Sequence, residues 1–202
     1  MSGPPFLYLT AGPSDRPGIL DRADLAARIG TLSIYDLRRA DLGGTTALLV
    51  PMHADQIHLA RCRDVVEGYL SGGGAIVFNG HVAHPFLPEL RRFVPLDRPK
   101  LADLHVVPAA PHPAFAGLDH REISLRRGVA GFYGRGHNPM PAGAVAVNAL
   151  ASGRVPVDWV WRRPGGGLLF MHAGNDLWMY ASDRSGAAEI LPNLLDWLER
   201  GA

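Results

Sequence analysis

The chain has 202 residues, of which 47% are hydrophobic, enough to form the core of one α/β domain spanning residues 1–202. Its 20 Lys and Arg residues nearly balance its 19 Asp and Glu residues, and because the basic residues are scattered, nucleic-acid binding is disfavoured. The single cysteine, Cys62, rules out a disulfide framework or a cysteine-based zinc site within one chain.

The first half of the chain alternates apolar, strand-like runs with segments of helical periodicity. Strands are expected at residues 6–10, 32–37, 46–51 and 75–78, and helices at residues 21–29 and 54–70. The first expected strand ends in a turn-rich loop, residues 11–15, from which Gly12 would reach a ligand. A simple turn explains this loop equally well.

The stretch that says most about the fold lies at residues 69–81. The expected helix ends in three glycines, and the wholly apolar run 75–78 follows them. Glycine supplies a left-handed helix cap, and an unbroken apolar run indicates a strand buried on both faces, as in a parallel sheet. Because ligands bind beyond the carboxyl ends of such strands, Asn79, Gly80 and His81 are expected to border a ligand site.

The second half of the chain is richer in short strands. Strand-like segments occur at 104–107, 122–126, 144–149, 155–161 and 168–171, a short helix or irregular segment at 85–93, and a closing helix at 187–198. In segment 155–161 the alternation places Val155, Val157, Trp159 and Trp161 on one face. The Gly- and Pro-rich loop 128–143 is long for a compact domain, so it is expected to be mobile or functional.

This order of elements predicts an α/β protein of flavodoxin-like architecture. A mostly parallel central sheet is expected to carry helices on both faces and to continue into an added antiparallel part.

Four segments of the chain carry a family resemblance. They are the helix–glycine–strand stretch 69–77, the His-Pro segment 112–118, the late strand with its preceding glycines at 165–172, and the end of the closing helix at 194–198. In this order they resemble the class I glutamine amidotransferase-like superfamily and, within it, the ThuA-like (trehalose-utilisation) branch. The resemblance implies a small polar, carbohydrate-related ligand and allows a homodimer.

The chain departs from this family at the catalytic residues. Amidotransferases of the superfamily place a cysteine nucleophile on a sharp turn directly after the buried strand, whereas here residues 79–81 hold no cysteine and Cys62 lies earlier, in the expected helix. By resemblance His172 matches the late-strand general base, but Asp176 is only the nearest acid to the glutamate that follows it in the family. Tyr133 stands where the ThuA-like branch has an acid-x-Tyr segment, without the acid. Glutamine hydrolysis by a thiolate is therefore not expected.

Three histidines, His53, His81 and His172, each follow an apolar strand closely. Parallel strands would bring all three to one sheet edge, where imidazoles are suited to acid–base chemistry near neutral pH. We predict His81, His172 and Asp176 as catalytic residues. The further predicted ligand-binding residues share a place in loops near this edge: Gly12, His53, Asn79, Gly80, His84, Tyr133, Asn175 and Trp178.

Each of these positions also has a plainer explanation. A histidine taken alone more often makes a hydrogen bond that fixes a loop, and Trp178 is as well explained by core packing as by stacking on a sugar. A metal ion held by histidines and Asp176 is conceivable, but no metal ligand and no cofactor is assigned.

The function expected from these residues is action on, or binding of, a small polar ligand in a histidine-rich pocket. A non-catalytic ligand-binding or assembly domain and a His/Asp metal-dependent hydrolase are the alternatives. The N-terminal residues show no leader pattern and no apolar run is long enough to span a bilayer, so a cytoplasmic protein without membrane contact is expected.

Overall fold

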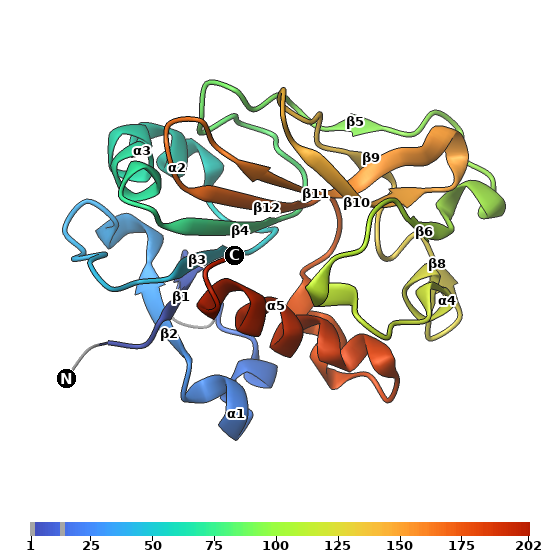
Figure 1. The fold of residues 1–202 in the computed structure, drawn as a ribbon, viewed down its shortest axis with the longest axis horizontal. Helices are drawn as coiled ribbons and strands as arrows, with labels where there is room; N and C mark the ends of the chain where they lie inside the picture. The colour runs from blue at the N-terminus through green and yellow to red at the C-terminus, as the bar shows by residue number, and fades with distance from the viewer. Residues whose placement is uncertain (1–2, 13–14) are drawn as a thin grey trace.

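A computed structural model describes residues 3–12 and 15–202 of the chain, which fold around one eight-stranded sheet of order β2-β1-β3-β4-β12-β11-β10-β6 (Figure 1). The first five strands in this order run parallel: β2 (Ile29–Ser33), β1 (Phe6–Thr10), β3 (Ala47–Val50), β4 (Ala75–Asn79) and β12 (Leu168–His172). The last three are antiparallel to their neighbours: β11 (Val155–Arg162), β10 (Val145–Leu150) and β6 (Val106–Pro108). The parallel part has the flavodoxin-like strand order, which confirms the predicted fold class.

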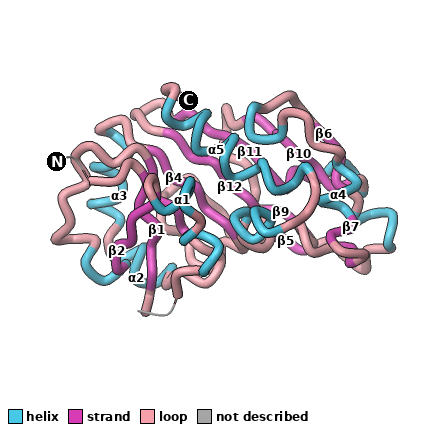
Figure 2. Tube along the Cα trace, turned by 90° about the horizontal axis from the view of Figure 1, so that it is seen from below, coloured by secondary structure: helices cyan, strands magenta, loops and turns pink. Residues whose placement is uncertain are grey.

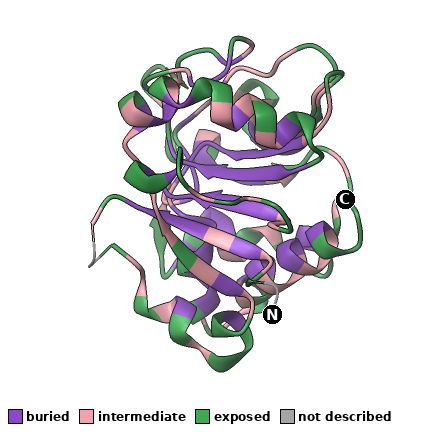
Figure 3. Ribbon diagram, turned by 90° about the vertical axis from the view of Figure 1, so that its left-hand side faces the viewer, coloured by how far each residue is buried: buried purple, intermediate pink, exposed green. Residues whose placement is uncertain are grey.

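Two apolar layers bury the parallel strands on both sides. Every residue of β3, β4 and β12 is buried, which explains why their sequences are unbroken apolar runs. Side chains that alternate along β12 enter opposite layers, with Phe170 in one and Met171 in the other. Figure 3 shows these strands as a buried band between helices.

Short helices cover the two faces of the sheet. Helices α2 (Gln56–Arg61) and α3 (Arg63–Ser71) pack on one face, and α5 (Ile190–Glu199) packs on the other, where it lies across the strands in Figure 2. The remaining α-helices are α1 (Ala23–Ala26) and α4 (His120–Ser124). The 3-10 segments are η1 (Gly18–Asp21), η2 (Ile34–Asp36), η3 (Leu101–Leu104), η4 (Pro113–Phe115), η5 (Ser152–Arg154), η6 (Leu177–Ser182) and η7 (Gly186–Glu189).

Two small ribbons complete the structure. Strands β5 (Val94–Pro95) and β9 (Gly136–His137) form one, and β7 (Leu125–Arg126) and β8 (Val129–Ala130) form the other. No helix of the described residues is both long and apolar enough to cross a membrane.

Several expected elements have other boundaries in the structure. The helix expected at 54–70 is two helices that meet at Cys62, whose ψ of 21° interrupts the helical backbone. The strand expected at 32–37 begins at Ile29, and residues 34–36 form η2, because Ser33 accepts a hydrogen bond from the Tyr35 amide and turns the chain. The strand expected at 122–126 is mostly α4, whose first turn is capped by the carboxylate of Asp119.

The predicted common face of β11 is also wrong. Trp159 and Trp161 enter the α3-side layer, whereas Val157 enters the α5-side layer. The pairing of β10 with β11 shifts register at Asn148, and such a bulge re-aims the side chains beside it. The shift leaves Asp158 directly opposite His172 across the β11–β12 pair.

Candidate functional site

The carboxyl ends of β3, β4 and β12 form one edge of the parallel sheet. Val50 is level with Phe78, and Asn79 is level with His172, so the chain leaves all three strands at nearly the same height. His53, His81 and His172 therefore belong to one sheet edge. They do not share one pocket, because His172 is fully buried while His53 and His81 are exposed in two different cavities.

His172 is the end of a buried polar network. Its Nδ1 lies 2.6 Å from Asp158 Oδ1, and the other carboxylate oxygen accepts hydrogen bonds from Asn148 Nδ2 at 2.7 Å and from the Tyr133 hydroxyl. His120 Nε2 lies 2.9 Å from Asn148 Oδ1 and extends the network toward the surface. A buried carboxylate needs such partners, because an unpaired charge in the interior is strongly unfavourable.

The 2.6 Å distance allows His172 Nδ1 to donate a hydrogen bond to Asp158. In the neutral tautomer that does so, Nε2 is a hydrogen-bond acceptor. Nε2 is buried without a hydrogen-bond partner among the described residues. It faces Gly174, where an added Cβ would lie 2.7 Å from Nε2, so the backbone of Gly174 covers the ring.

The sequence analysis did not predict a site role for Asp158, Asn148 or His120. The available signal was a lone carboxylate between apolar residues in an expected strand, since such a group must be paired if it is buried. Tyr133, predicted as a ligand-binding residue, is 1% exposed and belongs to this internal network.

The turn after β4 is the position at which the sequence resemblance predicts the place of a nucleophile. Gly80 has a φ of +95°, and an added Cβ would lie 2.8 Å from the Met52 Cα, so only glycine fits there. No helix follows directly; residues 80–93 run on without regular structure. Cys62 is buried in the α2–α3 layer, with its Sγ 3.4 Å from His58 Nε2.

The side chain of Asn79 links the segments that form this edge of the sheet. Its side-chain oxygen accepts a hydrogen bond from the Leu177 amide at 3.0 Å, and its Nδ2 donates to the Val50 carbonyl at 3.4 Å. The side chain is fully buried and bonded on both sides, so it joins β3, β4 and η6 and is not free for a ligand, contrary to its predicted role.

The larger cavity at this edge, which we call the β1–β3 cavity, has a volume of about 520 Å³. Its lining comes from the ends of β1 and β3 and from η6: Tyr8, Ala11, Asp15, Pro17, Pro51, Met52, His53, Ala54, Asp176 and Met179. Asp176 Oδ1 accepts a hydrogen bond from the Met52 amide at 2.7 Å. Burial raises the pKa of Asp176, and this hydrogen bond only partly opposes the effect.

A smaller cavity of about 210 Å³, the glycine-lined cavity, adjoins it at Met52. Its lining includes His81, Asn175 and three glycines of the loops around residues 131–134 and 174. His81 stacks on Phe93 with ring centroids 3.6 Å apart, and burial lowers the pKa of His81. Asn175 Nδ2 donates to the Phe132 carbonyl at 2.8 Å.

The loop expected to be mobile or functional packs over this edge. Asn138 in this loop is 1% exposed and bonds to the Val82 amide and the Gly80 carbonyl, both at 2.9 Å. Phe132 and Arg135 of the same loop line the glycine-lined cavity. The loop therefore helps to build the site.

The other predicted residues lie outside both cavities. Gly12 belongs to the loop after β1 without lining the β1–β3 cavity, and residues 13–14 of that loop fall outside the described residues. His84 is exposed. Trp178 is fully buried and packs edge-on against Tyr8 with centroids 5.2 Å apart, so the core-packing alternative holds for it. Within residues 3–12 and 15–202, no three His, Cys, Asp or Glu side chains are grouped closely enough to hold a metal ion.

The strand order and the cavities at the carboxyl edge define a flavodoxin-like α/β protein. No family model and no curated protein sequence matches the chain. Among solved structures, the cytoplasmic protein STM3548 from Salmonella typhimurium is similar, with a TM-score of 0.64, 12% identity, and coverage of 95% of this chain and 98% of that one.

Two further structures share the fold. A putative ThuA-like protein from Bacteroides uniformis matches with a TM-score of 0.50 and 11% identity, over 98% of this chain and 93% of that one. The GH42 β-galactosidase Gan42B matches with a TM-score of 0.51 and 11% identity, over 98% of this chain but only 30% of that one. At these identities the likeness concerns the fold alone.

Proposed function

We propose that this protein binds a small, hydroxyl-rich polar ligand in the β1–β3 cavity and forms no covalent intermediate with it. The observation that carries the proposal is the carboxylate of Asp176, which lines a cavity of about 520 Å³ at the carboxyl edge of a parallel sheet. Ligands of flavodoxin-like proteins bind at this edge, and small-molecule sites typically measure about 300–1,000 Å³.

The chemistry of the lining favours a polyhydroxylated ligand. Asp15 and Asp176 supply carboxylate oxygens that accept hydrogen bonds from hydroxyl groups, and His53 adds an imidazole. Tyr8, Met52 and two prolines supply apolar walls against which the carbon face of a sugar ring can pack. This composition suits a mono- or disaccharide.

The turn after β4 supports non-covalent binding. Gly80 occupies the place of the expected nucleophile and cannot be replaced without a clash, and Cys62 is buried elsewhere. We propose that the protein belongs to the ThuA-like branch of the class I glutamine amidotransferase-like superfamily and lacks its catalytic cysteine. The fold shared with a ThuA-like protein supports this assignment, and the β-galactosidase neighbour makes sugars the first ligands to test.

A thermal-shift panel of trehalose, glucose and galactose tests the proposal. A ligand at a hundred times its Kd stabilises the fold by about 2.7 kcal/mol, which for a chain of this size raises Tm by roughly 5–10 °C. The variant Asp176→Asn should lose most of the shift, whereas Asp97→Asn, which changes an exposed carboxylate, should keep it. No shift with any of the three sugars would contradict the proposal.

Acid–base catalysis by His172 is a second candidate, favoured by the Asp158 carboxylate beside its Nδ1. It requires the Gly174 backbone, which covers the unpartnered Nε2, to move aside. It predicts hydrolysis of p-nitrophenyl galactoside that His172→Gln abolishes and that His84→Gln, at an exposed position, leaves unchanged. Absence of turnover in the wild type would remove this candidate and leave the binding proposal standing.

A further inference from the structure

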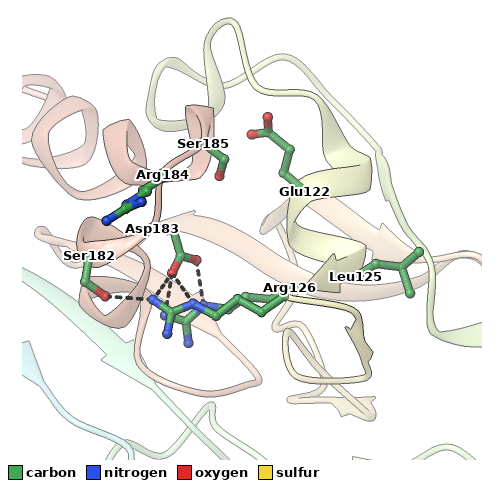
Figure 4. A pocket seen from close by; sticks show the side chains of 8 residues that line it. Glu122, Leu125, Arg126, Ser182, Asp183, Arg184 and Ser185 are labelled. Atoms are coloured by element: carbon green, nitrogen blue, oxygen red, sulfur yellow. Dashed lines mark hydrogen bonds and ion pairs between the residues drawn. The ribbon is translucent and has the colours of Figure 1, made fainter.

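A third cavity is lined by arginines (Figure 4). Its volume is about 600 Å³. Its charged and hydroxyl lining comes from α4, the β7–β8 hairpin, the end of η6 and the residues that follow η6: Glu122, Arg126, Arg127, Ser182, Asp183, Arg184 and Ser185. We call it the arginine cavity. None of its lining residues lines the β1–β3 cavity.

Both carboxylate oxygens of Asp183 accept hydrogen bonds from guanidinium groups. Arg126 donates to its two oxygens at 2.6 and 3.0 Å, and Arg127 donates to Oδ1 at 3.1 and 2.8 Å. Burial alone would raise the pKa of Asp183, but the hydrogen bonds from these arginines lower it below its usual range. Asp183 therefore stays ionised and holds the pair of guanidinium groups in place.

The cavity keeps positive charge that Asp183 does not neutralise. Arg184 is exposed and makes no ion pair among the described residues. The side chain of Arg127 is 67% exposed although it bonds to Asp183. Glu122 is the only other carboxylate in the lining, and its Oε2 accepts a hydrogen bond from the Ala187 amide at 3.1 Å. Three guanidinium groups thus face two carboxylates, and one positive charge remains.

The turn that carries Arg127 has an unusual backbone conformation for an arginine. Arg127 and Gly128 form the two-residue turn between β7 and β8, with φ values of +50° and +80°. Turns with positive φ at both central residues strongly favour Asn-Gly, because arginine is strained in this conformation. The arginine at the first position adds an exposed guanidinium group to the cavity lining, although asparagine would suit the turn better.

We propose that the arginine cavity binds the phosphate group of a small phosphate monoester. The side chain of Arg127 is 67% exposed and can donate to an oxygen of a doubly charged phosphate, while Asp183, held by Arg126, fixes its position. Arg184 adds a second exposed positive charge to the lining. The hydroxyl oxygen of Ser185 accepts a hydrogen bond from the Ala187 amide at 3.3 Å. The hydroxyl proton is therefore left to donate to a phosphate oxygen.

The test is a titration of inorganic phosphate into the full-length protein, followed by two-dimensional amide NMR at an ionic strength held constant with sodium chloride. Saturable shifts are expected at residues 125–128 and 182–186. The double variant Arg127→Asn/Arg184→Gln should raise Kd at least about tenfold, as expected for two lost charge-assisted hydrogen bonds. Asparagine suits the turn, so this variant should fold.

Matched controls decide the outcome. Arg63→Gln/Arg92→Gln removes the same charge from exposed positions outside the cavity and should bind phosphate like the wild type. Arg184→Gln alone, at a residue without ion pairs in the described fold, should weaken binding several-fold and serves if the double variant does not fold.

Unsaturable shifts in the wild type, or equal loss in the control double variant, would overturn the proposal. Glycerol 3-phosphate should bind at least as tightly as phosphate, and acetate at least about tenfold more weakly, because it carries a single charge. Acetate binding as tight as phosphate would overturn the assignment to a phosphate group.

Discussion

Replacing Tyr133 by phenylalanine removes one donor from the buried carboxylate of Asp158. In the wild type that carboxylate accepts hydrogen bonds from three side chains, and Tyr133 is 1% exposed, so water cannot take the place of the lost hydroxyl without opening the core. A hydrogen bond to a charged group contributes roughly 1.5–3 kcal/mol. Asn148 Nδ2 also loses its 3.3 Å contact with the hydroxyl, which places the expected loss near the upper end.

Urea-induced unfolding, followed by tryptophan fluorescence, measures this loss. A decrease of about 2–3 kcal/mol should lower Tm by roughly 4–12 °C for a protein of this size. Tyr35→Phe is the matched control, because its hydroxyl bonds Asp55 at 3.3 Å on the surface and should contribute less than about 1 kcal/mol. If Tyr133→Phe were no more destabilising than Tyr35→Phe, the buried network would not be a stabilising unit.

The remaining predictions concern backbone fit and pH. Gly68→Ala, at an exposed position in α3 with open space around it, should stabilise the protein by about 0.5–1 kcal/mol, whereas Gly80→Ala should destabilise it by about 2 kcal/mol or more in the same urea assay. Burial lowers the pKa of His112 to about 4, so the unfolded state binds more protons and stability falls as pH decreases from about 6.5 toward 4. His112→Asn should remove roughly 1–3 kcal/mol of that dependence, allowing for solvent screening, and His105→Asn, at an exposed site, should not. The raised pKa of Asp176 has the opposite effect on the pH dependence: the folded state binds more protons, so stability is lost as pH rises above 3.8. The stability of Asp176→Asn relative to the wild type should therefore increase between acidic and neutral pH. A difference in stability that does not change with pH would contradict this.

The sequence predicts the parallel core because its signal is local. Runs such as 75–78 and 168–171 are apolar throughout, and only a strand buried on both faces explains them. The triple glycine before β4 and the turn at Gly80 follow from the same pattern. The common edge of His53, His81 and His172 is then a consequence of parallel topology.

The division of that edge into separate environments depends on contacts far apart in the chain. His172 is buried because Asp158, Asn148 and Tyr133 come from β11, β10 and the long loop to meet it. Alternation in a strand does not reveal which polar side chain is paired, and the register shift at Asn148 that turns Asp158 inward leaves no local mark. Likewise, α4 resembles a strand in sequence, and its capping by Asp119 decides the outcome.

The most direct test of the proposed function is a two-dimensional amide NMR titration with trehalose and with galactose. Binding in the β1–β3 cavity predicts saturable shifts at Tyr8, Ala11, Met52 and Ala54, which Asp176→Asn abolishes and Asp97→Asn preserves. Shifts confined to other parts of the molecule, or shifts of equal size in Asp176→Asn, would contradict the proposal that this cavity is the ligand site.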